Sequence, residues 1–148
     1  MDRKQFIKTC GLTCFCATSV ATLMQSCSAS RIITGNIEAD ELVVSLDHFE
    51  PEEGTETEFR KYIIVYNDLI KYPICVFRFN EREYTALWMR CTHQGNELRV
   101  FGDMLQCPAH GSEFDNRGDV KNGPAEVALR SFPVTIGKNQ IRISLKAV

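Results

Sequence analysis

Histidine is scarce in this sequence, and positive charge is not in excess. The chain has 3 histidines among 148 residues, and its 17 basic residues are outnumbered by 19 acidic ones, giving a formal net charge of −2 at pH 7. Nucleic-acid binding depends on a basic surface that neutralises phosphates, so no nucleic-acid partner is expected. After its first 27 residues the sequence also lacks any long helical pattern. This argues against a helical fold.

Disulfide pairing is not indicated either, although the chain has 7 cysteines. Cys10, Cys14, Cys16 and Cys27 lie near the start, and Cys75 lies in an apolar run. We interpret the first three as small apolar residues of a segment that is removed, and Cys75 as a small residue of the core. The other two cysteines each lie close to a histidine, and these four residues carry the chemistry.

Two short elements each combine a cysteine with a histidine. The first reads Cys-Thr-His-Gln-Gly at 91–95, and the second reads Cys-Pro-Ala-His-Gly at 107–111. Their thiolates and imidazoles belong to Cys91, His93, Cys107 and His110. Such a set suits a tetrahedral zinc ion. It equally suits a [2Fe–2S] cluster with one iron on two cysteines and the other on two histidines. The ligand types alone leave both alternatives open.

The residues after the second element favour the iron–sulfur cluster. Residues 107–115 read Cys-Pro-Ala-His-Gly-Ser-Glu-Phe-Asp, and Gly-Pro-Ala follows at 123–125. Together with the first element, this pattern resembles the Rieske [2Fe–2S] domain. The resemblance covers residues 41–148, and its specific motifs lie within 91–125. It implies one [2Fe–2S] cluster per chain, and a structural zinc-binding module is the lesser alternative.

The resemblance also implies how the cluster is held. Two hairpin loops each donate one cysteine and one histidine, so that Cys91 and Cys107 bind the buried iron while His93 and His110 bind the outer one. A third loop covers the cluster. The residues expected around it are Gly95, Gly111, Ser112, Phe114, Gly123 and Pro124. The glycines let the backbone approach closely, and groups near the cluster tune its potential.

Four positions bear on the stability and potential of such a cluster. Respiratory Rieske proteins cross-link the two loops with a disulfide, but this chain has Asn96 and Ala109 at those places. Hydrogen bonds and packing must therefore hold the loops. Ser112 matches a hydroxyl that bonds a bridging sulfide in high-potential members, whereas Phe114 replaces a tyrosine that bonds a cysteine sulfur. We expect a potential in the middle of the Rieske range, which runs from roughly −150 to +300 mV.

Strand-like segments recur along the rest of the chain, with apolar and polar residues in alternation. The expected strands are 41–46, 62–66, 74–79, 84–89, 97–101, 104–106, 128–132 and 140–145, with a tight turn at Gly102-Asp103. This predicts an all-β fold, a Rieske-type antiparallel β-sandwich or partly open barrel, with a small cluster-binding subdomain of two hairpin loops. We divide the chain into a leader at 1–27, a linker and first strand at 28–40, and a Rieske domain at 41–148.

The first 27 residues resemble a bacterial export signal. Three basic residues among the first eight precede an uncharged stretch from Thr9 to Met24. That stretch is shorter than the ~20 residues of a membrane-spanning helix. Cys27 ends a sequence similar to a lipobox, which predicts a lipoprotein; an uncleaved membrane anchor is the alternative. Residues 2–8 resemble a twin-arginine export motif, and the general route is left open. We expect an exported protein, anchored to a bacterial membrane and facing the periplasm.

These features predict one-electron transfer by an electron carrier rather than by a stand-alone enzyme. The expected partners are a redox protein or a membrane quinol, in a quinol-oxidising electron-transfer chain of which the protein is a subunit. A Rieske-type ferredoxin that feeds an oxygenase is the alternative, and the leader argues against it. The oxygenase itself is excluded, because its mononuclear iron needs two histidines and a carboxylate, and only His48 is left.

Overall fold

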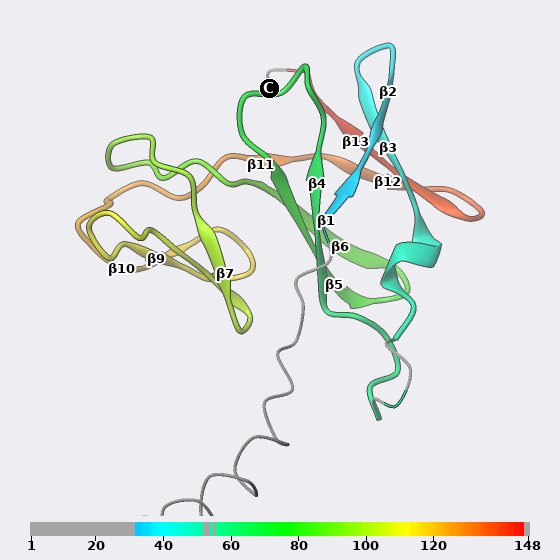
Figure 1. The fold of residues 1–148 in the computed structure, drawn as a ribbon, viewed down its shortest axis with the longest axis horizontal. Coiled ribbons are helices and arrows are strands. Elements are labelled where there is room, and N and C mark those ends of the chain that lie inside the picture. Colours follow the sequence, from blue (N-terminus) through cyan, green and yellow to red (C-terminus); the bar gives the residue numbers. More distant parts are fainter. Residues whose placement is uncertain (1–31, 52–53, 55, 147–148) are drawn as a thin grey trace, which may run out of the picture.

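Three β-sheets make up the described part of the chain. The computed structural model describes residues 32–51, 54 and 56–146, so the expected leader and Cys27 lie outside the described residues. Figure 1 shows a five-stranded sheet in the middle, with a smaller sheet on either side. The predicted all-β, mainly antiparallel fold is confirmed. Within the described ranges, no helix is long and apolar enough to cross a membrane.

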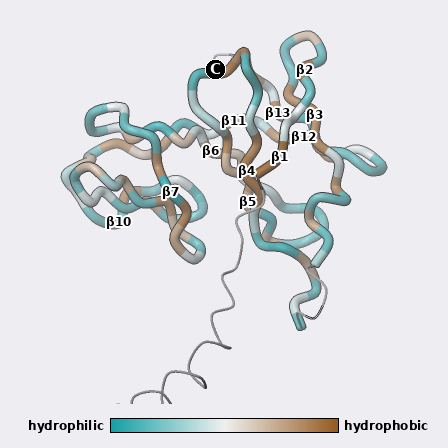
Figure 2. The backbone as a smooth tube through the Cα atoms, in the orientation of Figure 1, coloured by the Kyte–Doolittle hydropathy of each residue, from teal (hydrophilic) through white to brown (hydrophobic). Residues whose placement is uncertain are grey.

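The central sheet has the strand order β1-β4-β5-β6-β11. Its strands are β1 (Ile32–Thr34), β4 (Tyr62–Tyr66), β5 (Ile74–Asn80), β6 (Glu83–Trp88) and β11 (Ser131–Phe132). β1 runs parallel to β4, and the other pairs are antiparallel. β4 and β5 are rich in β-branched and aromatic residues, which suit a pleated and buried surface. A buried core covers each face of this sheet, and β4 and β5 are coloured as hydrophobic in Figure 2.

Successive residues of the central strands point to opposite faces and so enter two different cores. Ile63 and Val65 of β4 belong to one core, and Ile64 between them belongs to the other. On β5, Val76 lies in the first of these cores and Cys75 in the second. The predicted core position of Cys75 is therefore observed, with no exposed surface.

The second sheet covers one face of the central sheet, with the order β12-β13-β3-β2. Its strands are β2 (Asn36–Glu38), β3 (Glu41–Ser45), β12 (Val134–Ile136) and β13 (Gln140–Ser144), and a short 3₁₀ helix, η2 (Leu46–Phe49), follows β3. β3 and β13 alternate between buried and half-buried residues. The inward residues Leu42 and Ile141 have no exposed surface, because this sheet buries only one face.

The third sheet lies against the other face and has the order β10-β9-β8-β7. Its strands are β7 (Arg99–Phe101), β8 (Met104–Gln106), β9 (Glu113–Phe114) and β10 (Val120–Asn122). Leu105 and Phe114 pack with Leu87 of β6 in one core, and that core also contains Cys91 and Cys107. The predicted tight turn at Gly102-Asp103 joins β7 to β8, with Phe101 opposite Met104.

The strand predictions succeed where the alternating pattern is long. The predicted strand at 62–66 is observed as β4, and those at 74–79, 84–89, 104–106 and 140–145 match β5, β6, β8 and β13 to within one residue at each end. Two predictions were too long: the strand expected at 97–101 begins at Arg99, and that expected at 128–132 begins at Ser131. The backbone of Glu97 pairs with Arg90 as an isolated β-bridge outside the named strands, and the Leu129 N–H donates to the Gly118 carbonyl of a loop.

Four short strands were not predicted, namely β9, β10, β12 and one of the pair β1 and β2, because a single strand was expected at 28–40. Each has three residues or fewer, which is too few for an alternating pattern to be recognised. Both β1 and β2 lie within 28–40, where a linker and one strand were expected. The predicted division at residue 41 falls between β2 and β3, which pair with each other.

Candidate metal centre

The first Cys–His element forms a tight loop between β6 and β7. The Cys91 N–H donates to the Asn96 carbonyl at 2.8 Å, and the Gly95 N–H donates back to the Cys91 carbonyl at 2.8 Å. Gly95 has φ of 76°, a left-handed conformation that glycine adopts readily. The predicted need for glycine after the histidine is thus explained by the turn that brings the chain back beside Cys91.

The second element repeats the same backbone pattern between β8 and β9. The Cys107 N–H donates to the Ser112 carbonyl at 2.8 Å, and the Gly111 N–H donates to the Cys107 carbonyl at 3.0 Å. Gly111 has φ of 78°. The two loops therefore present a cysteine and a histidine from equivalent frameworks, although their sequences between those residues differ in length by one.

The four side chains divide into a buried sulfur pair and an outer nitrogen pair. Cys91 and Cys107 are each 1% exposed. The rings of His93 and His110 lie side by side, with centroids 5.1 Å apart and planes at 89°. His110 is exposed and His93 is half-buried. This separation of thiols and imidazoles is what a cluster with one iron on each pair requires.

His93 has a ring nitrogen that suits a ligand role. Its Nδ1 atom is buried and has no hydrogen-bond partner among the described residues. A buried polar nitrogen without a partner is costly, whereas a neutral imidazole nitrogen is a good ligand for iron or zinc. The residues present therefore fit a metal group at this place. In the described ranges, no three His, Cys, Asp or Glu side chains gather closely enough to hold a single ion.

The third loop joins both cluster loops. The Ala125 N–H donates to the Ser112 hydroxyl oxygen at 3.0 Å, and the Thr92 hydroxyl donates to the Val127 carbonyl at 2.6 Å. Gly123 and Pro124, joined by a cis peptide bond, precede these contacts. Ser112 is completely buried, and because its oxygen accepts from Ala125, its own proton is left for another acceptor.

The kind of centre follows from the protein family that the sequence matches. The model of the Rieske [2Fe–2S] domain matches residues 53–133, more than half of the chain. The chain belongs to the Rieske [2Fe–2S] domain family. It therefore binds a Rieske-type [2Fe–2S] cluster and takes part in electron transfer.

Curated relatives of this Rieske domain include subunits of cytochrome b6-f complexes. It is 32% identical over 63 residues to the cytochrome b6-f complex iron-sulfur subunit of Chlorobaculum tepidum, covering 41% of this chain and 35% of that protein. It is 38% identical over 56 residues to the iron-sulfur subunit 2 of Nostoc, covering 36% and 32%. The chain thus spans about a third of the length of these relatives.

Solved structures resemble the domain over more of its length. A plasma membrane Rieske protein of the cyanobacterium Synechocystis has a TM-score of 0.50 and 26% identity, covering 57% of this chain and 86% of that one. A chain from the complex of reduced oxygenase and oxidised ferredoxin of carbazole 1,9a-dioxygenase has a TM-score of 0.53 and 23% identity, covering 74% and 96%. The second likeness concerns the fold alone.

Phe114 was predicted to lie beside the cluster, and Cys75 was predicted to be a small residue of the core. Phe114 has no exposed surface and belongs to the core beside the two cysteines, so no hydroxyl is offered from its position. Cys75 is a free thiol, and burial raises its pKa well above the ordinary value. A neutral, inaccessible thiol agrees with a packing role. Asn96 and Ala109 leave the loops without a cross-link.

Two residues that hold the first loop were not recognised from the sequence. The Tyr72 hydroxyl donates to the Gly95 carbonyl at 2.6 Å, and the Thr92 hydroxyl reaches the third loop. Thr92 lies inside the first Cys–His element, so its place in the sequence could have indicated a role in holding the loop. Tyr72 precedes Gly95 by 23 residues, and no local pattern connects the two.

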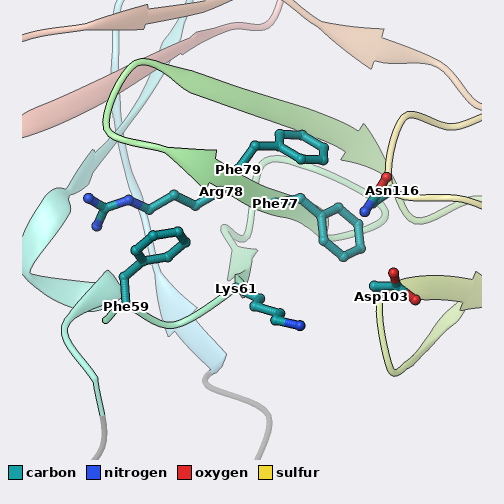
Figure 3. Close-up of a pocket in the computed structure, with 7 residues that line it drawn as sticks. All are labelled: Phe59, Lys61, Phe77, Arg78, Phe79, Asp103 and Asn116. Carbon is teal, nitrogen blue, oxygen red and sulfur yellow. The ribbon is translucent and has the colours of Figure 1, made fainter. Parts of the chain in front are cut away.

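A separate hollow of about 220 Å³ lies between the central sheet and the turns of the third sheet. Figure 3 shows the residues that line it: Phe59, Lys61, Phe77, Arg78, Phe79, Asp103 and Asn116. None of the four Cys and His residues of the metal centre belongs to this lining, so the hollow is distinct from the centre.

Asp115 organises the turn that follows the second loop. Its Oδ1 accepts from the N–H groups of Arg117 and Asp119 at 2.9 and 3.0 Å, and its Oδ2 lies 2.9 Å from the Lys121 Nζ. Burial by itself would raise the pKa of this carboxyl, but Lys121 and the two N–H groups outweigh it and hold the pKa below the ordinary value. The charged form therefore stabilises the folded state.

Asp115→Asn is expected to lower the midpoint of thermal unfolding at pH 7 and to matter less in acid. A lowered folded pKa gives stability above the unfolded pKa of about 3.9 that is lost as the pH falls through the folded pKa. Since the pair is partly exposed, we expect about 0.5 kcal/mol, or about 1 to 3 °C. Circular dichroism at pH 7 and below pH 4 measures the difference. Asp103→Asn, at an exposed turn, is the control, and an equal loss at both pH values would contradict the prediction.

Proposed function

We propose that this Rieske domain carries one electron at a time on a [2Fe–2S] cluster held by Cys91, Cys107, His93 and His110. The buried, unpartnered Nδ1 of His93 carries this assignment, because it is a ligand atom that the protein itself leaves unsatisfied. The cluster supplies a one-electron couple at a potential above that of all-cysteine ferredoxins. The buried thiols anchor it on the side of the core.

The imidazole side is the place where electrons enter and leave. His110 is exposed and lies beside His93, whereas the two thiols are shielded by the core. A partner that approaches the domain therefore meets the histidines first. Pro108 and Ala109, which precede His110, are exposed as well, so that side of the loop is open to a redox protein or a membrane quinol.

The remaining cluster-loop residues prepare the surroundings of the group. The Ser112 hydroxyl is buried, and its oxygen accepts from the Ala125 N–H. Its O–H can therefore donate to a bridging sulfide. Gly95 and Gly111 allow the close turns. Phe114 offers no hydroxyl, so we propose a potential in the middle of the Rieske range. Gly123 and Pro124 belong to the loop that covers the two elements.

We further propose that the Rieske domain is tethered to a bacterial membrane and faces the periplasm. The domain comprises residues 41–148 together with the strands that precede them. The uncharged stretch at 9–24 and Cys27 support a lipoprotein leader, with an uncleaved anchor as the alternative. The relatives named as cytochrome b6-f subunits and the plasma membrane Rieske protein support a membrane setting. In that setting the domain is a subunit of a quinol-oxidising chain.

A Rieske ferredoxin that feeds an oxygenase is the second candidate. The absence of cross-linking cysteines at Asn96 and Ala109 favours it, and the leader favours the tethered form. The mass of the mature protein shows where its N-terminus lies and whether it carries lipid, and so distinguishes the tethered carrier from the ferredoxin. A diacylated Cys27 or a membrane-bound full chain supports the tethered carrier, and a soluble full chain beginning at Met1 contradicts it.

The electron-transfer assignment predicts a red-brown holoprotein with two irons and two sulfides per chain. After reduction by dithionite, electron paramagnetic resonance should give a rhombic signal with a low average g value, because the extra electron resides on the histidine-bound iron. A structural zinc module would be colourless and without this signal. Purification of the full chain, metal analysis and the spectrum test it, and a zinc-loaded colourless product would overturn the proposal.

A further inference from the structure

Tyr72 reaches the first cluster loop from the central sheet. It lies between β4 and β5, and its hydroxyl donates to the Gly95 carbonyl at 2.6 Å. This hydrogen bond is part-buried, so it is partly shielded from water. Gly95 follows His93 by two residues, which places the contact inside the loop that carries two of the proposed ligands.

The ring of Tyr72 is held in place by its neighbours. It meets Trp88 edge to face, with centroids 5.5 Å apart and planes at 89°, an arrangement favoured by the charge distribution of aromatic rings. The Lys71 ammonium lies 5.5 Å from the Tyr72 ring centroid. Trp88 ends β6, three residues before Cys91, so the tyrosine is braced against the strand that leads into the loop.

Gly95 is held from three sides. Its N–H donates to the Cys91 carbonyl, and its carbonyl accepts from Tyr72. A Cβ added at Gly95 would come within 3.2 Å of the Arg90 Nε, so the Arg90 side chain lies against its remaining side. The Gly95 carbonyl belongs to the peptide that joins Gly95 to Asn96, so the Tyr72 hydrogen bond acts directly on the orientation of that peptide.

The orientation of that peptide determines where the Asn96 N–H points. In a trans peptide the carbonyl and the following N–H point in opposite directions. Because the Gly95 carbonyl points to Tyr72, the Asn96 N–H points away from it. Within the part of the chain that the structure describes, this N–H has no backbone or side-chain acceptor. Hydrogen-bond donation to a carbonyl also polarises the N–H of the same amide.

We propose that Tyr72 is a positioning residue for the cluster: through the Gly95–Asn96 peptide it aims and polarises an N–H toward the cluster, raises its reduction potential and slows its loss. An N–H dipole stabilises the additional negative charge of the reduced state. Tyr72 thereby does part of what a loop cross-link at Asn96 and Ala109 would do. The inference rests on the ligand set proposed above.

Tyr72→Phe tests this, because it removes one oxygen atom and keeps the ring. The reduction equilibrium is expected to shift toward the oxidised form by roughly three- to tenfold, in line with the loss of one hydrogen bond. At 59 mV per tenfold for one electron, this is about 30 to 59 mV. Bleaching of the cluster by an iron chelator should also become several-fold faster.

Tyr66→Phe is the matched control. Its hydroxyl donates to the Glu97 carboxylate at 3.1 Å, so the same atom is removed near the same loop without touching the loop backbone. The potential and the bleaching rate of Tyr66→Phe should match those of the native holoprotein. Circular dichroism of both variants reports the fold independently of the cluster.

A second variant changes the strength of the donor instead of removing it. 3-Fluorotyrosine at position 72 is a stronger donor than tyrosine and is expected to raise the potential above the native value. An unchanged potential in Tyr72→Phe would overturn the inference, whatever its bleaching rate, as would equal shifts in Tyr72→Phe and Tyr66→Phe. If the native protein itself lacks the rhombic signal, the ligand set fails instead, so the two failures are distinguishable.

Discussion

Replacement of Cys107 by alanine is expected to abolish binding of the [2Fe–2S] cluster. The buried iron would lose one of its two thiolates, and alanine offers no ligand in exchange. Iron and sulfide analysis, visible absorbance and the electron paramagnetic resonance spectrum of the reduced protein should all lose the cluster contribution. His93→Ala should have the same effect, because it removes the Nδ1 that the protein leaves unpartnered.

The chain provides a matched control in Cys75→Ala. Cys75 and Cys107 are buried to the same extent, at 0% and 1% exposure, and both lie in the core that contains the metal centre. Removing either sulfur costs about 1 to 3 kcal/mol of packing. The Cys75 variant should retain a complete cluster, and the Cys107 variant should not. A stoichiometric cluster in Cys107→Ala would contradict the ligand assignment.

Thermal stability should separate the two cysteine variants as well. A ligand that binds only the folded state stabilises it in proportion to its affinity, so the loss of the cluster adds to the loss of packing. The unfolding midpoint of Cys107→Ala is expected to fall well below that of Cys75→Ala. Scanning calorimetry of the two purified variants, one with the cluster and one without it, measures this difference, and equal midpoints would indicate that the cluster does not support the fold.

Ser112→Ala is expected to lower the reduction potential while the cluster stays assembled. The substitution removes the O–H group that is proposed to donate to a bridging sulfide and so to stabilise the reduced state. A hydrogen bond to a charged group contributes about 1.5 to 3 kcal/mol, which corresponds to about 65 to 130 mV for one electron. Protein-film voltammetry or a redox titration followed by absorbance measures the shift.

The same substitution also removes the acceptor of the Ala125 N–H. This donor would become unsatisfied, and we expect a cost of about 1 to 3 kcal/mol in the free energy of unfolding. Ser131→Ala, at an exposed position of β11, controls for the general effect of losing a hydroxyl. A potential in Ser112→Ala equal to that of the native protein would show that the hydroxyl does not reach the cluster.

The prediction of the metal centre depended on local patterns. Cys91 and His93, like Cys107 and His110, lie so close in sequence that one loop must present both. Gly95 and Gly111 indicated the left-handed turns that the structure contains at φ of 76° and 78°. Long strands were predictable for a related reason, because alternation over five or more residues distinguishes a strand with one buried face.

The sequence by itself therefore determined the kind of cluster, the all-β class and the absence of a cross-link between the loops. Only the tertiary structure decided how the loops are held, since the contacts of Tyr72 with Gly95 and of Thr92 with Val127 join residues 23 and 35 positions apart. Such contacts arise when the central sheet, the cluster loops and the third loop pack together. No local propensity encodes that packing, because it is the burial of two separate cores on the two faces of one sheet that brings these residues together.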